Sequence, residues 1–565
     1  MWLFKALSLS YVGTPMLIPN RFVLLFVLSF GMLAVSSATI SRVAADEPRM
    51  KLTGQVIDAG TQRPVAARIY IQSADGKWFF PKSSSPDGSA IEYKRQAGPA
   101  SIEQHVTLSA HPFVVIVTPG QYTITVERGK EYVPLVQTVV VGGKKDVEVT
   151  LPIQRWIDMS SLGWYSGDVH AHRPLVDMPN LIMAEDLNVA MPLSHWVTAA
   201  DTSPVSGNRV KEPAPKPEWI KVDPLHGIYP LNTEYENFTV GGKSHTLGAV
   251  LICGQKTPLD HGVPPVRRIA ERAHAEGAFL DLEKHSWAWS PMIVPLMKVD
   301  LFELANNHCW RTEFGFPAWT LDAAPKSMNL ELTDKGFTEW GWIDFGFQSY
   351  YAYLNCGFRM MPSAGTGAGV HPVPLGFGRV YVRVPGEFTF DKWRANLLAG
   401  RSFVTTGPLM QMQFNGEEAG HTFRVTTDKA SVRVTGVVES TSSLGRIEII
   451  QNGNVVWSEV PAQPTSTRGH ITATVDQTIT FDRSGWLIVR SFENRPDQRI
   501  RFAHSAPIFV EIPGKPLVPK KAEVEHFVDR IERELARHKG VLNADTIDEY
   551  HEALMIYRDL LTRAK

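Results

Sequence analysis

The chain has 565 residues, which is too long for a single hydrophobic core and predicts three or four domains. Its 57 basic and 58 acidic residues nearly cancel, and no basic stripe or tail stands out, which argues against nucleic acid as a partner. A hydrophobic content of 44% is ordinary for a globular protein.

Residues 1–45 are predicted to be a signal peptide. Arg21 precedes an apolar run over residues 22–35, and small residues that suit a signal peptidase follow it. The run is short for a membrane span and no second long apolar run follows, so we expect export to the periplasm or cell exterior without a stable membrane span. The cysteines Cys253, Cys309 and Cys356 allow at most one disulfide.

Residues 50–155 are predicted to form a β-sandwich. Short alternating segments, such as 52–58 and 120–126, are separated by turn residues. Two motifs in them, G-x-V-x-D and G-x-Y-x-I-x-V, resemble those of the carboxypeptidase regulatory-like (transthyretin-type) domain. The resemblance implies an accessory module, because fold alone does not confer a catalytic site.

The hydrophobic pattern of the sequence changes over residues 156–385, where strand-like and helical segments alternate. Apolar runs at 249–252 and 278–282 read as strands. Between them, residues 264–276 carry apolar side chains at helical spacing and end at Gly277, a typical helix C-cap. This alternation predicts an α/β layer or barrel.

The last two segments are predicted to be a second β-sandwich and a helical hairpin. Residues 386–512 alternate again, with turns such as Asn415-Gly416 between the strands. Residues 513–565 carry two amphipathic patterns separated by Gly540. We expect this hairpin to pack on its own chain or on a second subunit, so an oligomer is one option.

A pair of histidines gives the first indication of chemistry. His170 and His172 stand one residue apart beside a predicted strand, so both imidazoles face the same side. Two neutral nitrogen donors at one point suit a transition metal. Further histidines fall at the ends of predicted strands, where an α/β barrel builds its sites; these are His195, His245, His285 and His308.

The motifs of this region resemble those of PHP-domain (polymerase and histidinol phosphatase) metallohydrolases, and specifically their CehA/McbA-like branch. Gly167-Asp-Val-His-Ala-His172 resembles the opening G-D-x-H-x-H. Later segments resemble the following motifs in order; they are 185–195, 232–236 with 244–245, 275–285, 300–306 and 364–371. Residues 393–408 are similar to the G-R-x-F-x-T-x-G-P run that follows that domain.

The resemblance implies a distorted (β/α)₇ barrel that binds two or three metal ions, commonly Zn²⁺, Mn²⁺ or Fe. Carried over by position, the metal ligands are His170, His172, His195, Glu234, His285 and His371. Glu236 competes with Glu234, because a strand would place both side chains on one face. His285, His308 and Asp177 are the candidate catalytic groups, which would relay protons when they do not bind metal.

Two segments depart from the family pattern. Leu193-Ser-His195 stands where the family has T-D-H, and the carboxylate of the closing G-S-D-x-H motif is missing before His371. Loss of an anionic ligand lowers the affinity for one ion or changes the count, so one to three ions remain open.

The pattern as a whole predicts an exported metal-dependent hydrolase. Metal-activated water would attack an ester, carbamate or phosphoester bond in a small-molecule or carbohydrate-linked substrate. Arg359 or Arg379 could hold an anionic substrate group. The alternatives are a non-catalytic secreted protein that binds carbohydrate or cell wall through its tryptophans, and a degenerate PHP-like protein that binds metal without turnover.

Overall fold

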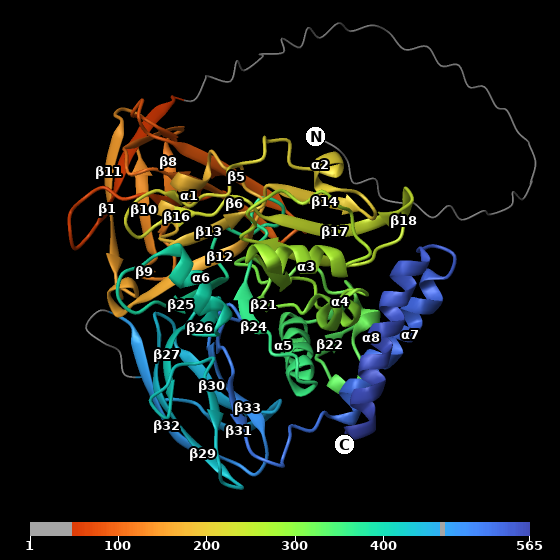
Figure 1. Cartoon of the computed structure of the whole chain (residues 1–565). Helices are drawn as coiled ribbons and strands as arrows, with labels where there is room; N and C mark the ends of the chain where they lie inside the picture. Colours follow the sequence, from red (N-terminus) through yellow and green to blue (C-terminus); the bar gives the residue numbers. More distant parts are fainter. Residues whose placement is uncertain (1–47, 464–468) are drawn as a thin grey trace, which may run out of the picture. The chain divides into compact units, whose positions relative to one another are not determined.

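The protein is a multidomain mixed α/β protein with several sheets and a C-terminal helix pair (Figure 1). The computed structural model describes residues 48–463 and 469–565, and the predicted signal peptide lies outside them. Residues Pro48–Lys565 form one compact unit. Within the described ranges, no helix combines the length and the apolar character that a membrane crossing needs.

Two sheets built from residues 50–155 share one core. The first has the order β4-β7-β1-β11-β9, and the second β10-β8-β2-β6-β5 with β3 paired to β2. Leu52 and Leu151 of the first sheet and Ile69 and Ile124 of the second are fully or almost fully buried in a common cluster. The strands are β1 Met50–Asp58, β2 Ala67–Ser73, β3 Trp78–Phe79, β4 Lys82–Ser83, β5 Ala90–Gln96, β6 Ile102–Leu108, β7 Phe113–Val117, β8 Gly120–Glu127, β9 Tyr132–Val133, β10 Leu135–Val141 and β11 Val147–Arg155.

One long sheet contains strands from both sides of residue 385. Its order is β15-β16-β13-β12-β25-β26-β34-β33-β30-β31, with β35 paired to β33 and β28 paired to β35. β12 pairs with β25, β25 with β26, and β26 with β34. The strands are β12 Trp164–Ala171, β13 Val189–Pro192, β15 Ile220–Lys221, β16 Gly227–Ile228, β25 Arg379–Arg383, β26 Ser402–Thr405, β28 Thr422–Arg424, β30 Leu444–Gln451, β31 Asn454–Glu459, β33 Gly485–Glu493, β34 Phe502–Ser505 and β35 Ile508–Glu511.

A second sheet of the central segment has the order β14-β17-β19-β20-β21-β24, with β18 paired to β17. Apart from the hairpin of residues 332–337, the strands of residues 164–383 are therefore divided between two sheets, and this pairing does not show the predicted seven-stranded barrel. Its strands are β14 His195–Ala199, β17 Thr233–Val240, β18 Lys243–Ser244, β19 Ala249–Cys253, β20 Phe279–Leu282, β21 Leu301–Ala305 and β24 Met361–Ala364.

The helices of the central segment connect these strands. The predicted helix before Gly277 is present as α3, and Gly277 ends it in the left-handed conformation at φ 77°. A short hairpin, β22 Leu332–Thr333 with β23 Gly336–Phe337, precedes α5. The helices are η1 Ser160–Leu162, α1 Met178–Ala184, α2 Pro204–Gly207, α3 Arg267–Glu276, α4 Ser290–Met297, η2 Leu321–Ala323, η3 Lys326–Met328 and α5 Glu339–Asn355.

The segment 386–512 is mainly β, as predicted, but it begins with a helix that the sequence pattern did not reveal. This helix, α6 (Phe390–Leu398), is capped by the Thr389 side chain and buries Phe390, Trp393 and Leu397. A separate sheet of this segment has the order β27-β29-β32; its strands are β27 Leu409–Phe414, β29 Ala430–Ser440 and β32 Ile471–Phe481.

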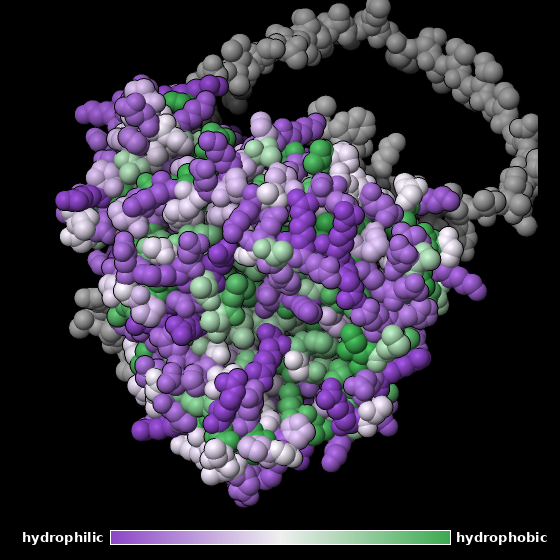
Figure 2. Space-filling view, viewed as in Figure 1, coloured by the Kyte–Doolittle hydropathy of each residue, from purple (hydrophilic) through white to green (hydrophobic). Residues whose placement is uncertain are grey.

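The predicted helical pair at the C-terminus is present as α7 (Lys521–His538) and α8 (Ala544–Arg563), which lie side by side (Figure 1). Phe527 of α7 packs against Tyr557 of α8, with ring centroids 5.0 Å apart. Figure 2 shows hydrophilic residues over most of one face of the molecule, with smaller groups of hydrophobic residues between them.

Candidate metal centre

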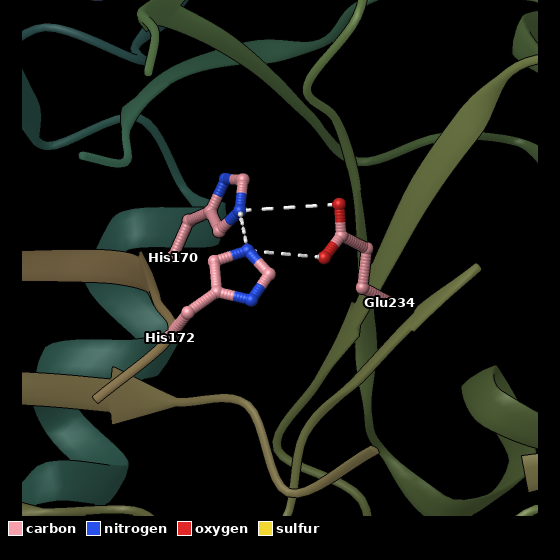
Figure 3. Close-up of side chains that lie close together, drawn as sticks. All are labelled: His170, His172 and Glu234. Atoms are coloured by element: carbon pink, nitrogen blue, oxygen red, sulfur yellow. Dashed lines mark hydrogen bonds and ion pairs between the residues drawn. The ribbon is translucent and has the colours of Figure 1, made fainter. Parts of the chain in front are cut away.

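Strand β12 delivers the two histidines of the HxH motif to one point. His170 is the penultimate residue of β12 and is fully buried. His172 follows the strand, and its backbone N–H donates to the carbonyl of Ala368 at 2.8 Å. The two Nε2 atoms lie 3.2 Å apart (Figure 3). The spacing of two therefore brings both imidazoles together, as the sequence predicted.

Glu234 on β17 completes a group of three (Figure 3). Its Oε2 lies 3.3 Å from Nε2 of His172, and its Oε1 lies 4.0 Å from Nε2 of His170. The three ligand atoms all lie within 4.8 Å of one another. Two imidazoles and one carboxylate are a donor set that divalent transition metals accept.

The state of the Glu234 side chain tests whether this group fits a cation. Glu234 is fully buried, and neither carboxylate oxygen has a hydrogen-bond partner. Burial, reinforced by the nearby carboxylates of Glu283 and Glu236, raises the pKa of Glu234 well above its ordinary value. A buried carboxylate without a partner is costly unless a cation satisfies it. His170, His172 and Glu234 therefore fit a metal ion and could hold one.

A further carboxylate, Glu303 of β21, orients His170 from behind. Nδ1 of His170 lies 2.9 Å from Oε2 of Glu303 and 3.6 Å from Oε2 of Glu283. A carboxylate on Nδ1 leaves Nε2 as the nitrogen free for a metal, the arrangement commonly seen behind metal-binding histidines. Asp168 holds the same strand end, because its Oδ1 accepts from the backbone N–H of His170 at 3.1 Å.

Lys284 supplies a buried positive charge beside the group. Its Nζ lies 2.6 Å from Oε2 of Glu283 and 3.6 Å from Oε1 of Glu236. Although burial opposes the charge, the glutamates around Lys284 raise the pKa of its ammonium above the ordinary value. The sequence motifs did not indicate roles for Glu283, Lys284 or Glu303. Glu283 and Asp281 alternate in and just after the apolar strand β20, and that alternation was the available signal.

The alternatives Glu234 and Glu236 are separated by their surroundings. Oε2 of Glu236 accepts from Nε1 of Trp196 at 3.0 Å, and its Oε1 faces Lys284.

His195 begins β14 and does not end the preceding strand, contrary to expectation. Its Nδ1 lies 3.1 Å from Oγ of Ser194, and it stands outside the group of three.

Three other predicted histidines pack among aromatic rings outside this group. The rings of His308 and His371 are 5.3 Å apart. Burial, and then the charges of Lys284, His172 and His170, lower the pKa of His371 well below its ordinary value. His285 packs against Phe302, Trp342 and Phe345, and its buried Nε2 has no hydrogen-bond partner. Burial alone lowers the pKa of His285 to about 3.

Asp177 and His245 face other partners. Asp177 precedes helix α1, and its Oδ2 lies 3.2 Å from Nη2 of Arg173. Nε2 of His245 lies 2.9 Å from Nδ1 of His538 on α7, which ties β18 to the helix pair. Neither residue belongs to the group of His170, His172 and Glu234.

The tryptophans near this region are mostly core residues. Trp289 and Trp310 are fully buried, and Trp287 and Trp342 are nearly so. Trp340 is partly buried, and Trp319 is 40% exposed, with its ring 6.0 Å from that of Trp287. The cysteines Cys253, Cys309 and Cys356 are all free and buried.

No protein-family model matches the chain, and no curated protein matches it. Among solved structures, the chain is similar to the crystal structure of a two-domain protein from Bacteroides vulgatus ATCC 8482 that contains a predicted PHP-like metal-dependent phosphoesterase. The two share 11% sequence identity, and the alignment covers 60% of this chain and 95% of that chain, with a TM-score of 0.25. A similarity at that TM-score carries no argument about function, so the candidate metal centre stands on its own geometry.

Proposed function

We propose that the protein is an exported metal-dependent hydrolase in which His170, His172 and Glu234 hold a divalent ion, Zn²⁺, Mn²⁺ or Fe. The observation that carries the proposal is the buried Glu234 carboxylate, which has no hydrogen-bond partner and faces two imidazole Nε2 atoms. The PHP-type barrel and the CehA/McbA-like branch belong to the same proposal and are supported by the order of the sequence motifs.

The proposed reaction is hydrolysis of an ester, carbamate or phosphoester. A divalent ion bound here would lower the pKa of a water ligand and polarise the scissile oxygen. Glu303 fixes the orientation of His170, and Lys284 offsets the charge of Glu283 and Glu236. The ring of His308 lies 5.3 Å from that of His371, and His308 remains the candidate to relay a proton if it does not bind metal.

Two further parts of the proposal come from the sequence. The apolar run after Arg21 supports export, and a small-molecule or carbohydrate-linked substrate suits a secreted hydrolase. A metal-binding protein without turnover is the second candidate, and one observation favours it. His371, whose motif lacks the family's carboxylate, lies outside the group of His170, His172 and Glu234.

Metal content and turnover together test the proposal. The purified full-length chain is analysed by elemental analysis and assayed on aryl esters, aryl carbamates and p-nitrophenyl phosphate. We expect bound metal and hydrolysis that a chelator abolishes and added metal restores. His172→Ala should lose both, whereas Asp476→Asn, at an exposed carboxylate paired with Arg433, should keep both. Bound metal without hydrolysis of any substrate favours the non-catalytic candidate, and absence of metal overturns both.

A further inference from the structure

A cavity of about 210 Å³ lies where the two sheets of residues 50–155 meet the long sheet. Its lining comes from β8 and the turn after it, from the loop before β25, and from the loop after β26. Thr406 and Gly407 of this last loop belong to the run that resembles G-R-x-F-x-T-x-G-P, a motif that the metal centre does not use. None of His170, His172 and Glu234 lines this cavity.

Three cations face this cavity without a carboxylate of the lining to pair with. Nζ of Lys130 donates to the carbonyl of Thr406 at 2.7 Å and lies 4.0 Å from the ring centre of Phe377. Arg379 is fully buried and donates to the carbonyls of Gly376, Glu185 and Asp186. Within the described ranges, neither Lys130 nor Arg379 forms an ion pair. Buried charges are normally paired, so an unpaired Arg379 is unusual; Lys130 is half-buried.

The third cation, Arg501, is 5% exposed and donates to the carbonyls of Ile500 and Arg311. The carboxylate nearest to it is that of Glu339, whose Oε1 lies 3.5 Å from Nη1 of Arg501. Glu339 does not line the cavity. Glu339 is shared with Arg499, which is closer at 2.9 Å. Arg501 therefore has only part of one counter-charge.

The acidic residues of the lining are already paired with other arginines. Glu127 and Glu185 both bind Arg68. Glu493 and Asp497 both bind Arg495, at 3.1 and 2.9 Å. Their pairing leaves the charges of Lys130, Arg379 and Arg501 as a local positive excess. Nε of Arg68 adds a buried donor that has no hydrogen-bond partner.

The ionisation of these groups agrees with a positive potential in the cavity. Burial and then the charges of Arg379 and Arg501 lower the pKa of Lys130 well below its ordinary value. Burial, with Arg499 and Arg495 nearby, lowers the pKa of Arg501 to about 10 even though Glu339 opposes the shift. Cations that disfavour one another in a confined space are stabilised by an anion placed between them.

We propose that this cavity binds a tetrahedral oxyanion, phosphate or sulfate, between Lys130, Arg379 and Arg501. Such an anion offers oxygens in several directions and can accept from more than one cation at once. The site does not depend on the metal. Asp168 connects it to the metal centre, because its Oδ2 accepts from Gly376 N–H at 2.9 Å while its Oδ1 accepts from His170 N–H.

The test is titration calorimetry of the full-length chain with inorganic phosphate, sulfate and acetate at constant ionic strength. Thr441 lines the cavity and is exposed, so Thr441→Glu adds a negative charge at the mouth, and Thr441→Gln is its uncharged match. Lys130→Gln removes one proposed contact directly. His172→Ala separates this site from anion binding at the metal.

We expect saturable binding of one phosphate or sulfate that His172→Ala retains. Thr441→Glu should bind about tenfold more weakly than Thr441→Gln, and Lys130→Gln at least about tenfold more weakly than the parent chain. No saturable binding, equal affinity in the two Thr441 variants, loss of binding in His172→Ala, or acetate binding as tightly as phosphate would each overturn the proposal. Glycerol phosphate binding more tightly than the free ion would identify the oxyanion as the head of a larger ligand, and weaker binding would identify the free ion.

Discussion

Glu303→Gln tests how His170 is held, because the change keeps the shape of the side chain and removes its charge. The hydrogen bond from Nδ1 of His170 to Oε2 of Glu303 is 2.9 Å long and both residues are fully buried. A bond between an imidazole and a buried carboxylate contributes about 1.5–3 kcal/mol, and an amide oxygen retains part of it. We therefore expect metal affinity to fall about tenfold to a hundredfold, as for other outer partners of metal-binding histidines.

The affinity is measured by competition with a chelating dye, after circular dichroism has shown that the variant is folded. Glu236→Gln is the matched control. It removes another buried carboxylate of the same cluster, but one that is bonded to Trp196 and faces Lys284 and has no hydrogen bond to His170. An affinity for Glu303→Gln that equals the parent's, or a loss no greater than that of Glu236→Gln, would refute the idea that Glu303 orients the histidine.

Three further predictions concern stability and pairing. Phe527→Ala should lower the free energy of unfolding by about 3–5 kcal/mol in denaturant titrations, because this ring is almost fully buried, whereas Met555→Ala, at a side chain 63% exposed, should change it by about 0.5 kcal/mol or less. Asp177→Asn should also stay within about 1 kcal/mol of the parent, since its ion pair is partly exposed; a larger loss would show that Asp177 has a second role. Burial lowers the pKa of His226, but bonds to two aspartates outweigh this and raise it overall, so its stabilisation is full below about pH 6.5 and disappears as the pH rises through the folded-state pKa. His226→Gln should therefore destabilise the protein at pH 6 and much less at pH 8; an equal effect at both would contradict this.

The parts of the fold that follow local rules could be predicted from the sequence. Period-two alternation placed His170 and His172 on one side, and Gly277 marked the end of α3 because a left-handed residue is needed there. The amphipathic patterns after residue 513 gave both helices of the C-terminal pair.

The parts that depend on distant pairing could not be predicted in the same way. β12 pairs with β25, a strand more than 200 residues later, and no local pattern records which sheet a strand joins. His195 begins a strand where the apolar run suggested an end, because the chain leaves one sheet at Pro192 and enters another at His195. Glu303 and Lys284 were missed because their roles depend on charges that other strands bring to them.

The hydrogen-bond ladder that runs from β12 through β25 into β26 and β34 has a practical consequence for anyone dissecting this chain. A fragment ended at residue 385 would keep every metal ligand named here, yet it would leave β25 as a bare sheet edge carrying Val380 and Val382, both fully buried in the intact protein. Bare apolar edges recruit other strands and aggregate. Recombinant expression of residues 156–385 alone should therefore give insoluble material. A fragment of residues 156–512, which retains β26 and β34, is the shortest one to attempt.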